Sequence, residues 1–170
     1  MASRLILGVT GHRLHLLPGY RGERSTQLRA LLLQLAMDKL EEWHPDLLIT
    51  GMATGWDMAM GAAAMFLNVP YRAYVPFLGQ EKLFAEADKS MYHSILEEAE
   101  DVRVFSPVQT KAAYIERDRA MVDDSDRMLA LYLGDPKTGT GQTLEYAEGW
   151  LVPWTNVAEE FLEQQNGLTP

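Results

Sequence analysis

The sequence predicts an α/β protein, a three-layer sandwich built on a mainly parallel sheet of about six strands. Short apolar runs typical of buried strands alternate along the chain with longer segments in which apolar residues recur at helical spacing. Such alternation is the signature of a sheet covered by helices on both faces. Glycine-bearing loops follow three of the apolar runs, at residues 11–13, 51–57 and 134–141. We therefore expect these loops at the carboxyl edge of the sheet, where such folds bind ligands.

The strands are expected where apolar residues run together. The clearest case is the run from Met128 to Leu133, which is continuous, as in a strand buried on both faces. The other five segments are also mainly apolar but are interrupted by polar or charged residues or by proline. In chain order, the expected strands are residues 4–10, 46–50, 69–77, 102–105, 127–133 and 152–157.

The helices are expected where apolar residues recur every three or four positions. Ser25 is a candidate N-cap for the first, a leucine-rich segment that ends at His44 and Pro45. The second is rich in alanine and methionine, which is typical of a helix packed closely on a sheet. In chain order, the expected helices are residues 26–43, 58–67, 80–99, 114–124, 142–150 and 158–165.

Length and composition favour one domain, residues 1–170. The chain is long enough to bury its own core, and 47% hydrophobic with 23% charged residues is ordinary for a soluble globular protein. The N-terminus lacks the apolar core of a signal peptide, and no apolar run approaches the roughly 20 residues of a membrane span. We expect a cytoplasmic protein with no membrane partner. The absence of cysteine excludes disulfides and thiolate chemistry.

The formal charge of −9 argues against a nucleic-acid backbone as the main partner, because phosphate contacts along a strand need clustered lysine and arginine. A small nucleotide is compatible with this charge, since a few cations and a helix N-terminus suffice to hold a phosphate.

The third glycine loop and the helix after it form a candidate phosphate site. Glycine lets the backbone approach a ligand closely, the first-turn N–H groups are unpaired, and the helix dipole favours an anion. The alternative is a turn that merely joins strand to helix. The candidate ligand-binding residues are Gly139, Thr140, Gly141, Gln142 and Thr143.

The first loop supplies three further candidates. Gly11, His12 and Arg13 end the first strand, where a base or phosphate would lie. His12 titrates near neutrality and could act as an acid or donor, although a structural hydrogen bond is the alternative.

The second loop is bracketed by Gly51, Gly55 and Asp57. Asp57 either caps the following helix or accepts hydrogen bonds from a ribose, and both roles are compatible.

Taken together, the loops resemble those of the SLOG superfamily, and most closely its YpsA-like branch. The motifs are V-T-G-H-R at residues 9–13, T-G-M-A-T-G-W-D at 50–57, R-D-R-A-M-V-D-D-S-D at 117–126 and T-G-T-G-Q-T at 138–143. The similarity runs from Leu5 to about Val157. It implies a Rossmann-like fold, a nucleotide or nucleotide-derived ligand and a homo-oligomer. The superfamily includes the LOG phosphoribohydrolases, DNA-processing protein A and predicted sensors of nucleotide signals.

Similarity to the LOG enzymes, which cleave the N-glycosidic bond of cytokinin riboside monophosphates, implies a catalytic pair. Those enzymes carry E-R-K-x-x-M and P-G-G-x-G-T-x-x-E, which residues 116–121 and 137–145 resemble. Arg117 and Glu145 thereby occupy the positions of the catalytic arginine and glutamate. From the residues alone, the favoured interpretation of Glu145 is instead a first-turn carboxylate stabilised by the helix dipole. Lys137, Thr138 and Gln142 depart from the second motif, so the phosphate loop is altered.

Two functions follow as alternatives. One is a phosphoribohydrolase-like N-glycosidase acting on a nucleoside monophosphate. The other is a non-catalytic sensor or sequestering protein for a nucleotide signal. Neither requires a cofactor, and no metal is expected, because the acidic residues at 123–126 are typical of a helix end.

Overall fold

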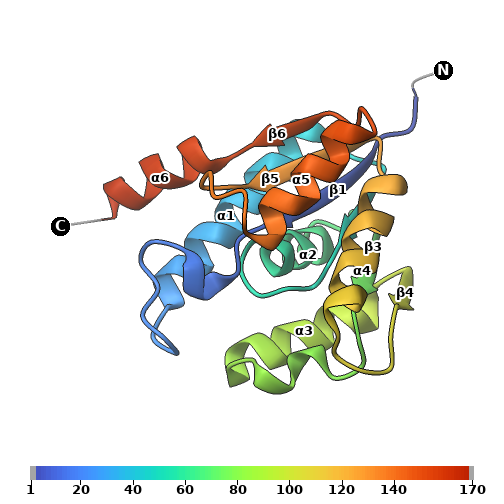
Figure 1. Cartoon of the computed structure of the whole chain (residues 1–170). Helices are drawn as coiled ribbons and strands as arrows, with labels where there is room; N and C mark the ends of the chain where they lie inside the picture. The colour runs from blue at the N-terminus through green and yellow to red at the C-terminus, as the bar shows by residue number, and fades with distance from the viewer. Residues whose placement is uncertain (1–2, 169–170) are drawn as a thin grey trace.

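Six strands form one sheet in the computed structural model, which describes residues 3–168 (Figure 1). Their order across the sheet is β4-β3-β2-β1-β5-β6, and every neighbouring pair is parallel. This confirms the predicted parallel sheet and the Rossmann-like architecture. The strands are β1 (Ile6–Gly11), β2 (Leu47–Thr50), β3 (Tyr71–Val75), β4 (Asp101–Val104), β5 (Arg127–Leu131) and β6 (Trp154–Asn156).

The helices cover both faces of the sheet. Successive crossovers from β1 to β4 place three helices on one face, and the return to β5 and β6 places two on the other. The last helix returns to the first face and packs on the first helix, while the fourth and fifth helices contact each other (Figure 1). The helices are α1 (Thr26–Trp43), α2 (Trp56–Phe66), α3 (Glu86–Glu98), α4 (Lys111–Asp123), α5 (Gly139–Gly149) and α6 (Ala158–Gly167). None in the described range is long and apolar enough to cross a membrane.

The core lies mainly between the sheet and the α1–α2 face. Nine of the eleven residues of α2 are buried, and its alanines and Gly61 let the helix approach the strands closely. The α4–α5 face holds two smaller clusters, one centred on Ile49, Tyr74 and Met121, the other on Val122, Met128 and Ala147. This packing fixes the start of α2 and the middle of α4 against the carboxyl edge of the sheet.

Several predicted boundaries were wrong by two residues or more, and three of these errors bear on the site. The helix expected at residues 80–99 is a 3-10 turn (Gln80–Leu83) followed by α3, because Phe84 and Ala85 are extended. The strand expected at residues 127–133 ends at Leu131. The helix expected from Gln142 begins at Gly139, so the predicted phosphate loop is largely the first turn of α5.

Ser25 precedes α1 as predicted, but its side chain does not cap the helix. Its hydroxyl oxygen accepts a hydrogen bond from the Arg21 amide at 2.6 Å and donates to the Gly22 carbonyl at 2.8 Å. Ser25 therefore stabilises the loop before α1.

Candidate functional site

The candidate site lies at the carboxyl ends of β1 and β5. The chain proceeds from β1 toward β4 on one side of the sheet and then returns to β5 on the other, so the two strands flank a topological switch point. Gly11 at the end of β1 is in register with Leu131 at the end of β5. A ligand crevice is expected at such a point, and a cavity of about 320 Å³, here called the inner cavity, is present there.

The inner cavity brings together seven of the thirteen predicted site residues. Six do not line it: Gly51, Gly55, Gly141, Gln142, Thr143 and Glu145. The seven that line it come from four elements of the fold and are Gly11, His12, Arg13, Asp57, Arg117, Gly139 and Thr140.

Two of the glycines outside the inner cavity support its wall. A Cβ on Gly51 would lie 2.6 Å from Nη1 of Arg117 and 2.8 Å from Oδ2 of Asp57. Gly55 has a φ of +91°, and a Cβ there would lie 2.5 Å from the carbonyl oxygen of His12. Both positions therefore require glycine so that the first two loops and α4 can approach one another.

The N-terminus of α5 presents free hydrogen-bond donors at the inner cavity. The Thr138 side chain caps the helix by accepting from the Gly141 amide at 3.1 Å. In the described part of the chain, no hydrogen bond satisfies the amides of Gly139 and Thr140 or the Thr140 hydroxyl. A Cβ on Gly139 would meet no atom within 4 Å. These donors and the helix dipole suit an anion.

The remaining residues of this turn have other roles. Thr143 is buried, and its hydroxyl donates to the Gly139 carbonyl at 2.8 Å inside the helix. Gln142 is exposed, and its side-chain nitrogen lies 3.5 Å from the Lys137 carbonyl oxygen. Glu145 is exposed on α5 away from the lining of the inner cavity. The described fold therefore does not bring Glu145 and Arg117 together.

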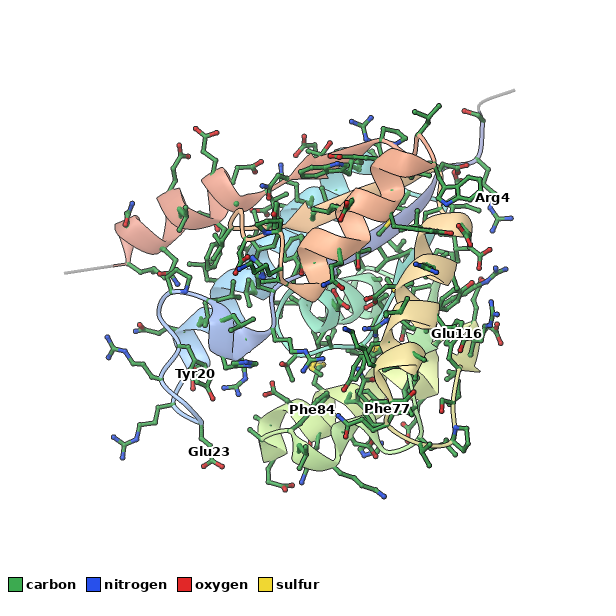
Figure 2. The ribbon with its side chains drawn as sticks, viewed as in Figure 1. Arg4, Tyr20, Glu23, Phe77, Phe84 and Glu116 are labelled. Atoms are coloured by element: carbon green, nitrogen blue, oxygen red, sulfur yellow. The ribbon has the colours of Figure 1, made fainter. Side chains whose placement is uncertain are left out.

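Arg117 is the buried cation of the site. Its side chain projects from α4, and only 5% of the residue is exposed. Nη1 donates to the carbonyl oxygen of Gly51, and Nε donates to Oδ1 of Asp118 at 2.7 Å. Neighbouring Glu116 is exposed and lies on the outer side of α4 (Figure 2). Only Arg117 of this pair can reach the inner cavity.

Asp57 is the buried carboxyl group of the site. The N-cap of α2 is Gly55, so the prediction that Asp57 caps this helix was wrong. Burial raises the pKa of Asp57 to about 7, against the opposing effect of the Arg117 charge. Its Oδ1 has no hydrogen-bond partner within residues 3–168. A carboxyl group in this state can give or take a proton near neutral pH.

His12 is a neutral donor rather than a free acid. Its Nε2 accepts a hydrogen bond from the Leu133 amide at 2.9 Å, which places the ring proton on Nδ1. That Nδ1 is buried and has no partner among the described residues. Burial lowers the pKa of His12, while the charge of Asp135 raises it. The predicted structural and donor roles can therefore both hold.

A second cavity of about 640 Å³, here called the outer cavity, adjoins the first and was not predicted. Four residues line both cavities: Arg13, His15, Ala53 and Tyr114. The sequence offered a signal for Tyr114, because it lies three residues before Arg117 and hence on the same side of a helix. No such signal marked Gln80, whereas Asp118 lies in the motif at residues 117–126 but was not selected as a site residue. Within residues 3–168, no group of three or more His, Asp and Glu side chains could hold a metal ion.

Solved structures with the same fold include two DNA-processing A proteins. The protein from Streptococcus pneumoniae superposes with a TM-score of 0.59 at 18% identity, over 89% of this chain and 49% of its own. The chain thus spans about half the length of that protein. The Helicobacter pylori protein, described as binding single-stranded DNA, gives 0.58 at 17% identity, over 95% and 73%.

A third structure, TM1055, gives a TM-score of 0.56 at 14% identity, over 88% of this chain and 72% of its own. These identities show a shared fold. A search of curated proteins found no match. At the level of sequence, the model of the YspA SLOG family matches residues 7–149, which is most of the chain. The chain therefore belongs to the YspA SLOG family.

Proposed function

We propose that this protein binds a nucleotide or nucleotide-derived ligand in the inner cavity, with a phosphate at the N-terminus of α5. The observation that carries the proposal is the pair of amides of Gly139 and Thr140, which have no hydrogen-bond partner within residues 3–168, at a cavity that Arg13 and Arg117 also line. Backbone donors, a helix dipole and two guanidinium groups together favour an anion in a chain whose overall charge is −9. The position at the switch point of the sheet supports the same ligand class.

We further propose that the site hydrolyses an N-glycosidic bond of a nucleoside monophosphate. Protonated Asp57 would donate its proton to the leaving base nitrogen as the C–N bond breaks. Water would then add to the anomeric carbon and return a proton to Asp57. Arg117 would bind the phosphate or the leaving base, and a carboxyl pKa of about 7 suits both proton transfers.

Glu145 keeps a place in the proposal through the LOG-like motif, but its exposed position makes Asp57 the better-placed carboxyl group. The alternative is a sensor or sequestering protein that uses the same phosphate contacts without turnover.

The test is mass spectrometry of the protein incubated with nucleoside mono-, di- and cyclic phosphates and ADP-ribose. Release of free base and sugar phosphate from one compound supports the hydrolase. Activity that disappears in Asp57→Asn and persists in Glu145→Gln assigns the proton transfer to Asp57, and the reverse assigns it to Glu145. Stoichiometric binding of an unchanged nucleotide supports the sensor. If no compound binds or reacts, the proposal is wrong.

Single-stranded DNA is a second candidate ligand, favoured by the likeness to the H. pylori protein over 95% of this chain. The charge of −9 opposes it. Fluorescence anisotropy with a labelled thymidine oligonucleotide at two salt concentrations tests whether single-stranded DNA binds. DNA binding requires affinity that falls steeply with added salt, whereas no binding at low salt removes this candidate.

A further inference from the structure

We propose that the outer cavity binds the base of the nucleotide whose phosphate lies in the inner cavity, and that this base carries an N–H donor. The inference rests on the proposed function and extends it to a second subsite. The outer cavity would then decide which nucleotides this protein accepts.

The two cavities adjoin, and one pair of side chains in contact lies on their shared border. The Arg13 guanidinium carbon lies 5.2 Å from the centre of the Tyr114 ring, and both residues line both cavities. A ligand held at α5 would therefore cross this pair to enter the outer cavity. Arg13 forms no ion pair within the described residues, so its charge is available to a phosphate or sugar on either side.

Aromatic side chains from separate segments line the outer cavity. Phe77 packs edge-to-face against Tyr114, with ring centres 5.4 Å apart and planes at 79°. Phe84 and Tyr20 come from the segment before α3 and the loop before α1, and Figure 2 labels both with Phe77. Stacking on aromatic rings is favourable for every base because each has a π-face. The wall thus suits a planar ring.

Gln80 supplies an unpaired acceptor at the same cavity. The residue is only 7% exposed, and its Oε1 is buried without a hydrogen-bond partner in the described chain. Its Nε2 lies 3.4 Å from the Gly51 carbonyl oxygen, which fixes the side chain with Oε1 unused. Buried acceptors without partners are rare, and an amino or ring N–H group of a base would satisfy this one.

The charge of the outer cavity also fits a phosphorylated ligand. Among the described residues, Asp88 is the only acidic one in its lining, and Arg29 neutralises it through two hydrogen bonds of 2.8 and 2.9 Å. Lys82 and Arg13 are left without ion-pair partners among residues 3–168. The cavity is therefore locally cationic in an acidic chain.

The test compares ribose 5-phosphate with AMP, GMP, CMP and UMP by titration calorimetry. The wild-type protein should bind at least one nucleotide about tenfold or more tightly than ribose 5-phosphate, as one stacked base contributes a factor of about 5 to 150. Gln80→Met should reduce this preference about tenfold and leave ribose 5-phosphate unchanged. The variant is expected to fold, because it removes an unsatisfied acceptor and Arg117 still donates to Gly51.

One further variant serves as a control and another tests the charge of the outer cavity. Gln34→Met, on α1 and outside both cavities, should change neither affinity. Lys82→Met, at an exposed position, should weaken nucleotide binding and its salt dependence. If nucleotides bind no more tightly than ribose 5-phosphate, or if Gln80→Met weakens both equally or neither, the base subsite is wrong while the phosphate site stands. If neither ribose 5-phosphate nor any nucleotide binds, the proposed function fails with it.

Discussion

Arg117 on α4 donates a hydrogen bond from Nη1 to the carbonyl oxygen of Gly51, in the loop that follows β2. The same guanidinium donates from Nε to Asp118 and places a positive charge beside Asp57. One buried side chain thus joins two elements of the inner cavity and sets its electrostatics.

Replacing Arg117 by methionine should lower the free energy of unfolding by about 2 kcal/mol, because buried hydrogen bonds from a charged group are lost. Urea denaturation measures this difference. Arg117→Lys keeps the charge but loses the planar guanidinium fork. Its free energy of unfolding should therefore lie between those of the wild-type protein and the methionine variant. A loss below about 0.5 kcal/mol for the methionine variant would show that this hydrogen bond contributes little to the fold.

Asp57 should make the protein less stable as pH rises. Its pKa is about 7 in the folded chain, against about 3.9 in an unfolded one, so the native state binds more protons between these values. The free energy of unfolding of the wild-type protein, measured relative to that of Asp57→Asn, should have its highest value near pH 4. It should then fall by on the order of 2–4 kcal/mol as pH rises through 7.

Urea titrations of both proteins at pH 4 to 8 measure this difference. A constant gap between the two curves would contradict the raised pKa. Burial also lowers the pKa of His12, so the comparison uses the difference between the two proteins rather than either curve alone.

Sequence alone predicted the strands well because four of the six, β1, β2, β3 and β5, are local apolar runs that the parallel sheet then buries. β4 is the instructive case, since all four of its residues are exposed at the sheet edge, and its pattern was the shortest. The break between Gln80–Leu83 and α3 was missed, because apolar periodicity continues across Phe84 and Ala85 although the backbone there is extended.

The site was predicted only in part, because its position follows from the order of the strands but the burial of its side chains does not. Glycine loops and motifs located the carboxyl edge, which follows from chain order in a parallel sheet. Burial could not be predicted, and it is burial that gives Asp57 its pKa of about 7 and leaves Glu145 outside the inner cavity. The outer cavity could not be predicted either, because Tyr20, Phe77 and Phe84, which line it, come from separate segments that only folding brings to one cavity.

Gly55→Ala should destabilise the protein by about 3 kcal/mol or more. The residue has a φ of +91°, and an added Cβ would lie 2.5 Å from the His12 carbonyl oxygen, which is backbone and cannot rotate away. Gly22→Ala is the matched control, because Gly22 also has a positive φ of 58° but no atom within 4 Å of the added Cβ. Its cost should be about 1 kcal/mol, from backbone conformation alone. Equal losses in thermal or urea unfolding would show that the close approach of the two loops does not matter.

Gly139→Ala and Gly149→Ala should separate ligand binding from stability. Both glycines lie in α5, neither has a positive φ, and a Cβ at either would meet no protein atom within 4 Å. Both positions are at a helix end, so alanine should leave the free energy of unfolding unchanged or raise it by less than the roughly 0.5–1 kcal/mol of a helix interior.

Only Gly139 lines the inner cavity, so only its Cβ would occupy the space where a phosphate would approach the Thr140 amide. Affinity for ribose 5-phosphate should fall about tenfold or more in Gly139→Ala and stay unchanged in Gly149→Ala, measured by titration calorimetry. Because both proteins should be at least as stable as the wild type, a selective loss cannot be attributed to unfolding. Equal affinity in the two variants would instead place the phosphate away from the N-terminus of α5 and remove the main support for the proposed site.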